Sequence, residues 1–161
     1  MKAAIYAGSF DPITNGHLDI IGRSAKVFDK IYVLAMINSE KKYAFTIEER
    51  VELIKQATKH CPKVVVDSYQ GLLVDYCRQK GIYTLIRGLR ALTDFDYEFQ
   101  MATINRKIDN NVESVLFVAS NKYSYVSSSV VKELASYGSD ISEIVPKAVD
   151  EALKKKLRGD K

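Results

Sequence analysis

No apolar run in the sequence is long enough to cross a membrane, which takes about 18 or more consecutive apolar residues. The N-terminus also lacks the basic region and the long apolar stretch of a secretory signal peptide. We therefore expect no membrane partner and a cytoplasmic protein.

Cysteine and histidine are scarce. Cys61 and Cys77 share no metal-type spacing with each other or with the two histidines, His17 and His60. Cys77 falls on the apolar side of an expected helix, which favours a reduced, packed thiol. The sequence predicts no metal site made of protein side chains.

Two common nucleotide-binding motifs are missing. Gly8, Gly16 and Gly22 do not have the spacing of G-x-G-x-x-G, which argues against an ordinary dehydrogenase. The phosphate-binding loop G-x-x-x-x-G-K-[ST] is absent as well. If ATP binds this chain, it binds in another way.

The excess of positive charge is small. The formal net charge is +4, and part of it comes from residues 154–156 and Arg158 near the C-terminus. No basic stripe interleaved with stacking aromatics is present, so we expect no nucleic-acid partner. A small anionic substrate accounts for the bias equally well.

The sequence does contain a regular alternation of apolar and amphipathic segments. Its 161 residues suit a single domain, 1–161. Apolar, β-branched runs predict five strands, at residues 3–7, 30–37, 63–67, 82–86 and 113–119. Amphipathic segments between them predict helices. We therefore expect an α/β fold: a Rossmann-like, doubly wound, five-stranded parallel sheet with helices on both faces and a C-terminal helical extension.

The opening stretch predicts a strand, a loop and a helix. The apolar run 3–7 stops at Gly8, a polar, turn-rich loop follows, and His17 opens an amphipathic segment. The first N–H groups of a helix have no internal partners and its dipole favours negative charge there, so such a junction suits phosphate. A tight connection without any function is the alternative.

Most of the unusual polar residues are expected at one edge of the sheet. Ligands of such folds bind beyond the carboxyl ends of the strands, where the strand order switches. The loops after the first, second, fourth and fifth strands contain residues 9–17, 41–42, 87–90 and 120–129. Singly, each side chain fits a surface ion pair or a cap. Together the donors suit a phosphate-rich ligand, and nucleotidyl transfer depends on such positioning and charge neutralisation.

Two short motifs resemble the signatures of the nucleotidyltransferase superfamily. Residues 14–17 (TNGH) resemble its T/H-x-G-H motif, and residues 127–132 (SSSVVK) resemble its second motif, the I-S-S-x-x-x-[RK] helix start. Lys132 stands where the superfamily often has Arg. The order of the motifs and the α/β layout make the pair specific.

Segments along essentially the whole chain are similar to the bacterial phosphopantetheine adenylyltransferases, at residues 8–17, 45–50, 85–90, 94–98 and 125–129. The resemblance implies transfer of AMP from ATP to 4′-phosphopantetheine, giving dephospho-coenzyme A and pyrophosphate, a step of coenzyme A biosynthesis. It also implies Mg²⁺ as a cofactor and a homohexameric assembly.

The same resemblance implies roles for individual residues. His17 would stabilise the transition state, and Lys41 and Arg90 would complete the catalytic set. The substrate-binding residues would be Ser9 (where the family usually has Thr), Lys41, Leu73 and Arg87. The ATP-binding residues would be Ser9, Phe10, His17, Gly88, Leu89, Arg90, Glu98, Tyr123 (where some members have Trp), Ser124, Tyr125, Val126, Ser127, Ser128 and Ser129.

The chemistry of His17 fits this role. A helix N-terminus disfavours the cationic imidazole, but a neutral ring still donates one hydrogen bond to a phosphate oxygen. The attacking group is then the phosphate of the substrate itself, which is already anionic near neutral pH and needs no general base.

Three other functions remain open at this point. One is a nucleotidyltransferase for nicotinate mononucleotide, a sugar phosphate or glycerol phosphate. Another is a non-catalytic sensor of adenine nucleotides, against which His17, Lys41 and Arg90 argue. The third is nucleic-acid binding, as in the distantly related class I aminoacyl-tRNA synthetases, but no appended basic domain is present.

Overall fold

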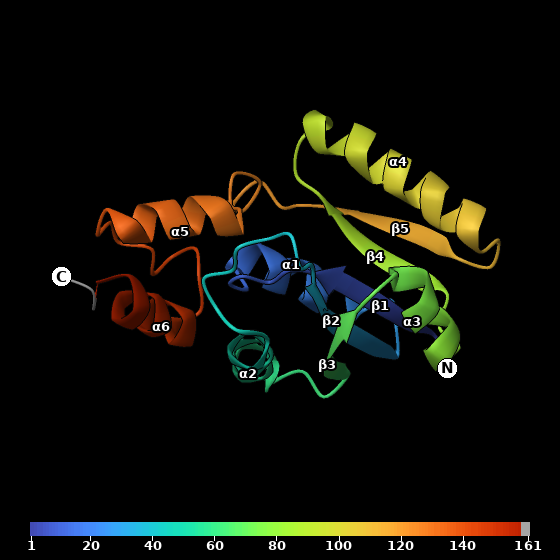
Figure 1. Cartoon of the computed structure of the whole chain (residues 1–161), viewed down its shortest axis with the longest axis horizontal. Helices are drawn as coiled ribbons and strands as arrows, with labels where there is room; N and C mark the ends of the chain where they lie inside the picture. The colour runs from blue at the N-terminus through green and yellow to red at the C-terminus, as the bar shows by residue number, and fades with distance from the viewer. Residues whose placement is uncertain (159–161) are drawn as a thin grey trace.

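A computed structural model describes residues 1–158, apart from the side chains of residues 92, 93, 157 and 158, and its strands alternate with helices along the chain (Figure 1). The strands are β1 (Ala3–Gly8), β2 (Lys30–Ile37), β3 (Val64–Gln70), β4 (Thr84–Leu89) and β5 (Glu113–Val118). The helices are α1 (Asn15–Ser24), α2 (Ile47–Thr58), α3 (Leu73–Lys80), α4 (Leu92–Ile108), α5 (Ser128–Ser136) and α6 (Lys147–Arg158).

The strands form one parallel sheet in the order β3-β2-β1-β4-β5. The chain moves outward from β1 through β2 to β3, then crosses back and adds β4 and β5 on the other side of β1. The predicted fold class, a doubly wound five-stranded parallel sheet, is confirmed. The strand order switches between β1 and β4, so a ligand is expected at the carboxyl ends of these two strands.

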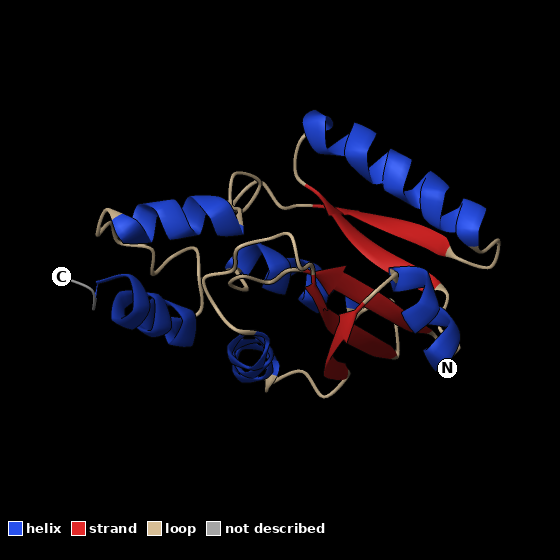
Figure 2. Cartoon of the chain, viewed as in Figure 1, coloured by secondary structure: helices blue, strands red, loops and turns tan. Residues whose placement is uncertain are grey.

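Helices cover both faces of the sheet (Figure 2). Successive strand residues point to opposite faces. Tyr6 of β1 belongs to a core cluster that includes Ile20 of α1, whereas Ile5 belongs to a second cluster with Val74 and Cys77 of α3. The two clusters are the two sides of the sheet, and β1 has residues in both.

The last two helices form the predicted C-terminal extension. Val131 of α5 and Val149 and Leu153 of α6 are fully buried in the same cluster as Tyr6. The extension therefore packs on the α1 side of the sheet and brings the start of α5 to the carboxyl end of β1. Within the described residues, no helix is long and apolar enough to cross a membrane.

Several element boundaries differ from the predicted ones, and two of these differences lie at the carboxyl ends of the central strands. Helix α1 begins at Asn15 rather than at His17, because the side chain of Thr14 accepts the backbone N–H of His17 and caps the helix. Strand β4 continues to Leu89, so residues 87–89 lie in the strand and not in the loop after it. Their backbones pair with residues 116–118 of β5, and this pairing holds polar Arg87 in an extended conformation.

Candidate functional site

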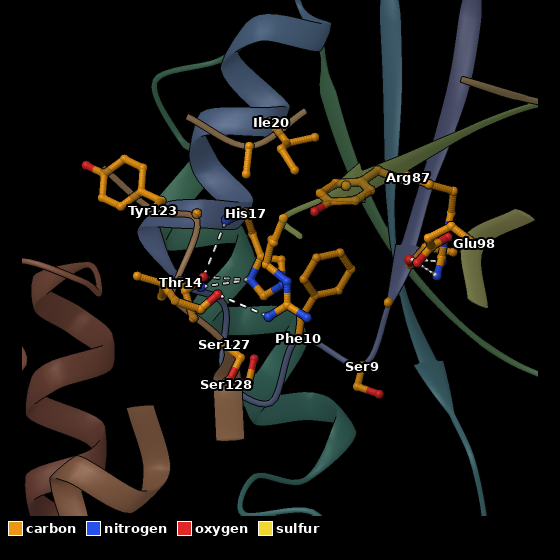
Figure 3. Close-up of a pocket in the computed structure, with 18 residues that line it drawn as sticks. Ser9, Phe10, Thr14, His17, Ile20, Arg87, Glu98, Tyr123, Ser127 and Ser128 are labelled. Carbon is orange, nitrogen blue, oxygen red and sulfur yellow. Dashed lines mark hydrogen bonds and ion pairs between the residues drawn. The ribbon is translucent and has the colours of Figure 1, made fainter. Parts of the chain in front are cut away.

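A cavity of about 270 Å³ opens at the carboxyl ends of β1 and β4, where the strand order switches (Figure 3). Its walls come from β1 and the loop after it, the first turns of α1, the end of β4, α4, and the loop before α5. The lining residues are Tyr6, Ala7, Gly8, Ser9, Phe10, Thr14, Gly16, His17, Ile20, Arg87, Gly88, Arg90, Glu98, Ala119, Tyr123, Val126, Ser127 and Ser128.

Most of the candidate site residues lie together in this cavity. Those in its lining are Ser9, Phe10, His17, Arg87, Gly88, Arg90, Glu98, Tyr123, Val126, Ser127 and Ser128. Those outside its lining are Lys41, Leu73, Leu89, Ser124, Tyr125 and Ser129. The structure thus gathers residues from four separate segments of the chain.

Lys41 and Leu73 lie along the same edge of the sheet, farther from the switch point. Lys41 is exposed in the loop after β2. Leu73 is the first residue of α3, just after the end of β3, and packs against the core cluster on the α3 face. A ligand reaching both from the cavity would have to extend across the ends of β1 and β2.

Several lining residues carry no motif signal of their own. Tyr6 follows from the alternation of β1, since it points to the same face as Gly8. Thr14 could have been found from its position three residues before His17, because the side chain of an N-cap residue accepts the backbone N–H of the third residue after it. Ile20 and Ala119 line the cavity only because α1 and β5 pass beside β4, which local sequence does not show.

The ring of His17 is held by the residue that caps α1. The backbone N–H of Thr14 donates to Nδ1 of His17 at 3.0 Å. Because Nδ1 accepts this bond, the proton of the neutral ring lies on Nε2. No described residue pairs with Nε2, so its N–H is free for a ligand in the cavity.

His17 is uncharged at neutral pH. Burial, and to a smaller extent the positive charge of Arg90, lowers the pKa of His17 from 6.5 to about 4. The ring also packs edge to face on Phe10, with ring centres 5.0 Å apart. Phe10 has a left-handed φ of 45°, a conformation that is costly for a non-glycine residue and is found at functional sites.

Arg87 and Glu98 form a two-pronged ion pair on the opposite wall. Nε of Arg87 lies 2.6 Å from one carboxylate oxygen of Glu98, and Nη2 lies 2.9 Å from the other. Nη1 of Arg87 also donates to the carbonyl oxygen of Ala7 at 3.1 Å. This pair joins β4, α4 and β1 around the cavity, and each charge already has a partner within the protein.

Gly88 allows β4 and α1 to approach closely at the cavity. A Cβ atom at this position would come within 2.5 Å of Cδ1 of Ile20. A larger residue would therefore push Ile20, one turn after His17, out of its place in the wall.

Arg90 is the first residue after β4 and spans two walls of the cavity. Its Nη1 donates to the carbonyl oxygen of Val126 at 3.2 Å, and its Nε lies 3.2 Å from Asp94. The side chain of Arg90 is 40% exposed. A partly hydrated guanidinium with one acidic partner keeps donors for an anionic ligand.

The start of α5 supplies a further set of donors. Ser127 caps the helix by accepting the backbone N–H of Val130, and the hydroxyl of Ser128 donates to the carbonyl oxygen of Pro12 at 2.8 Å. The N–H groups in the first turn of a helix have no acceptor within it and attract anions. Helices α1 and α5 both begin at the cavity.

Asp11 ties the loop after β1 to two other segments. One oxygen of its buried carboxylate accepts the backbone N–H of Phe45, at 2.9 Å. The other accepts the backbone N–H of Ala44 and lies 2.8 Å from Nζ of Lys132 in α5. The ends of the two loops and the start of α5 are therefore fixed to one another.

The arrangement suits group transfer between phosphates. It offers a neutral imidazole donor, a guanidinium and two helix N-termini, all directed at one cavity, and these groups stabilise negative charge. In the described part of the chain, no cluster of three or more His, Cys, Asp or Glu side chains has the geometry of a metal site.

Comparison with known proteins agrees with this chemistry. The model of the cytidylyltransferase-like family matches residues 5–134, and the chain belongs to that family. It is therefore a member of the nucleotidyltransferase superfamily, which implies a nucleotide substrate. In fold it is similar to a Vibrio parahaemolyticus protein assigned as a nicotinate-nucleotide adenylyltransferase, with 20% identity, a TM-score of 0.72, and 96% of this chain and 99% of that chain covered.

Proposed function

We propose that the protein is a pantetheine-phosphate adenylyltransferase, which transfers AMP from ATP to 4′-phosphopantetheine. The observation that carries the adenylyl-transfer chemistry is the unpaired Nε2–H of His17, held by Thr14 and directed into a cavity between two helix N-termini. The choice of acceptor is supported by the resemblance of the five sequence segments described above.

In the proposed reaction, a phosphate oxygen of 4′-phosphopantetheine attacks the α-phosphorus of ATP. The new P–O bond forms as the bond to the β-phosphate oxygen breaks, and the products are dephospho-coenzyme A and pyrophosphate. His17 donates Nε2–H to a non-bridging oxygen of the α-phosphate, where negative charge shifts in the transition state. With its pKa lowered to about 4, the ring carries no second proton to donate as a general acid near pH 7, and its lone pair on Nδ1 is occupied by the N–H of Thr14.

The remaining site residues bind and orient the substrates in this proposal. Arg90 and the first turn of α5 hold the phosphates of ATP. Ser9 lines the cavity at the end of β1, and the phosphate of the acceptor is expected beside it. Its pantetheine arm then runs along the edge of the sheet toward Leu73.

We propose that Mg²⁺ enters with ATP, coordinated by the phosphate oxygens of the nucleotide. The carboxylates near the cavity are already paired, Glu98 with Arg87 and Asp11 with Lys132. The described residues thus fit a nucleotide-bound ion better than a protein-bound one, and no step is assigned to a metal held by side chains.

We also propose a homohexamer. Helix α4 and the edge strand β5 expose large apolar side chains, which typical monomers bury. These are Phe95, Tyr97, Phe99, Ile104, Ile108, Leu116 and Val118. Light scattering after size-exclusion chromatography would give about six times the chain mass of 18.1 kDa, and a monomeric mass would contradict the assembly.

A panel of acceptors tests the function. The protein is incubated with ATP, Mg²⁺ and, in separate reactions, 4′-phosphopantetheine, nicotinate mononucleotide, glycerol phosphate and a sugar phosphate. We expect pyrophosphate release and a dephospho-coenzyme A mass only with 4′-phosphopantetheine. Release with another acceptor alone would move the protein to that substrate, and release with none would contradict adenylyl transfer.

A further inference from the structure

Arg50 of α2 has the largest of the fully buried side chains, with 1% of its surface exposed. It does not line the cavity. Arginine is almost never fully buried without an acidic partner, because a desolvated charge is costly unless an opposite charge compensates it. The contacts of Arg50 therefore need to be compared with those that usually compensate a buried guanidinium.

The partners of Arg50 are backbone carbonyls and an aromatic ring. Nη1 donates to the carbonyl oxygen of Ser9 at 2.6 Å and to that of Met36 at 2.9 Å. The guanidinium also lies 4.0 Å from the ring centre of Tyr43. Nε is buried and has no partner among the described residues. Arg50 thus joins the ends of β1 and β2 and packs against the loop that carries Lys41.

No carboxylate in the described part of the chain lies within ion-pair distance of Arg50. Two nearby carboxylates are paired with lysines: that of Asp11, two residues after Ser9, lies 2.8 Å from Lys132, and that of Glu49, next to Arg50 in the chain, pairs with Lys156. Glu49 also accepts the backbone N–H of Thr46, in the cap of α2. Arg50 therefore has a buried positive charge that no carboxylate of the described residues pairs with.

This charge lies directly behind the wall of the cavity. Ser9, whose carbonyl oxygen accepts the bond from Arg50, lines the cavity at the end of β1. A charge fixed in a water-poor interior acts on its neighbours more strongly than one in water. An anion bound beside Ser9 would feel this field and would in turn compensate the desolvated guanidinium.

We propose that Arg50 is a positioning residue of the polyphosphate site, whose buried charge is balanced by the phosphates of the bound ligand. It acts through Ser9, whose backbone it fixes, and does not contact the ligand itself. The inference rests on polyphosphate binding in the proposed function, but not on the identity of the acceptor.

Two substitutions separate the charge of Arg50 from its packing. Arg50→Lys keeps a positive charge, whereas Arg50→Gln keeps a donor for a carbonyl and loses the charge. Binding of inorganic pyrophosphate and of adenosine is measured by calorimetry at one low salt concentration, because salt screens the effect. Arg78→Gln is the control, since Arg78 also bonds a carbonyl, that of Ile108, but belongs to α3 and pairs with Asp109, away from the cavity.

If the charge of Arg50 acts on bound phosphates, its loss should affect pyrophosphate and not adenosine. We expect Arg50→Gln to weaken pyrophosphate binding about tenfold or more, as the loss of a nearby unit charge in a low-dielectric region implies. Arg50→Lys should retain most of the pyrophosphate affinity. Both variants should bind adenosine within about twofold of the parent, and Arg78→Gln should change neither ligand.

A purely structural role would give a different pattern. Both Arg50 variants would then lose pyrophosphate and adenosine affinity together, in proportion to their loss of thermal stability, and the proposal would fail. If Arg50→Gln does not fold, Arg50→Met, which fills similar volume without charge, takes its place. Failure of both neutral variants to fold would assign Arg50 to folding alone and overturn the proposal.

The outcome is separate from that of the acceptor panel. A parent protein that binds pyrophosphate in an Arg50-dependent way but transfers no AMP would contradict the proposed function and leave the role of Arg50 standing. If the parent transfers AMP and Arg50→Gln binds pyrophosphate normally, the proposed function stands and the role of Arg50 is contradicted.

Discussion

The loops after β1 and β2 end at the same edge of the sheet, but they differ in how they are held. Residues 10–14 are buried, and the β1 loop is bonded to the start of α5, to Lys132 and to Arg50. Residues 38–42, including Lys41, are exposed, and the contacts that hold this loop lie near its end, where Tyr43 packs against Arg50 and Asp11 accepts the N–H groups of Ala44 and Phe45.

The difference separates two kinds of contribution to catalysis. Donors that stabilise a transition state must be in place before the reaction, because reorganising them costs energy. The buried β1 loop meets that requirement, whereas an exposed loop gains its order from the ligand that it binds. Changes near the β1 loop should therefore lower kcat, and changes in the β2 loop should mainly raise KM.

The largest effect is expected for His17→Ala. Loss of an oxyanion-type donor typically lowers turnover by about 100- to 1,000-fold, and the fold should remain intact because Thr14 still caps α1. The measurement is the steady-state rate of pyrophosphate release, with His60→Ala as the control because His60 is exposed after α2. Near-normal turnover of folded His17→Ala would contradict the role of His17.

A smaller effect is expected for Arg90→Ala. A charge-assisted hydrogen bond is worth about 1.5–3 kcal/mol, so KM for ATP should rise about 10- to 100-fold. Stability should change little, because the ion pair of Arg90 with Asp94 is partly exposed. Initial rates at varied ATP and thermal unfolding check the two statements. An unchanged ATP dependence would remove Arg90 from the site.

A further effect is expected for Lys41→Ala, in the loop after β2. We expect KM for 4′-phosphopantetheine to rise about tenfold with a much smaller change in kcat, as for the loss of a ligand contact worth about 1.4 kcal/mol. Lys42→Ala is the matched control, since Lys42 is the next residue and is also exposed in the loop. Equal effects of the two substitutions would show a general charge effect and not a contact of Lys41.

The smallest expected effect is the contribution of His17 to the pH dependence of the free energy of unfolding. Burial, followed by the charge of Arg90, lowers the pKa of His17 from 6.5 to about 4. The unfolded chain therefore binds more protons than the folded chain between these values, and the free energy of unfolding should fall as the pH drops from about 6.5 to 4. In His17→Gln this part of the pH dependence should be absent, while His60→Gln should keep it. Urea unfolding at several pH values compares the variants, and identical curves for the parent and His17→Gln would contradict the burial of a neutral imidazole.

The element order was predictable because it depends on local patterns. Apolar runs such as residues 30–37 predicted the strands, as the structure confirms. The extension of β4 through Arg87 was not predictable, because a charged residue in a strand end is stable only when other segments supply its partners, here Glu98 and Ala7.

The contacts that hold the site were not visible in the sequence for a similar reason. Asp11 meets Phe45 and Lys132 across 34 and 121 residues of chain. Arg50 reads as one more polar position on an amphipathic helix, yet it is fully buried. The resemblance to known motifs indicated many of the residues that line the cavity, whereas the residues that fix them could be found only from the fold.

The most direct test is the protonation state of His17, because burial keeps the ring neutral and the hydrogen bond from Thr14 to Nδ1 leaves its proton on Nε2. Nitrogen NMR of protein labelled at its two histidines, with His60→Ala to assign the signals, reports this state at neutral pH. We expect a neutral ring with its proton on Nε2 and an unprotonated Nδ1. A charged imidazolium, or a proton on Nδ1 with a bare Nε2, would contradict it.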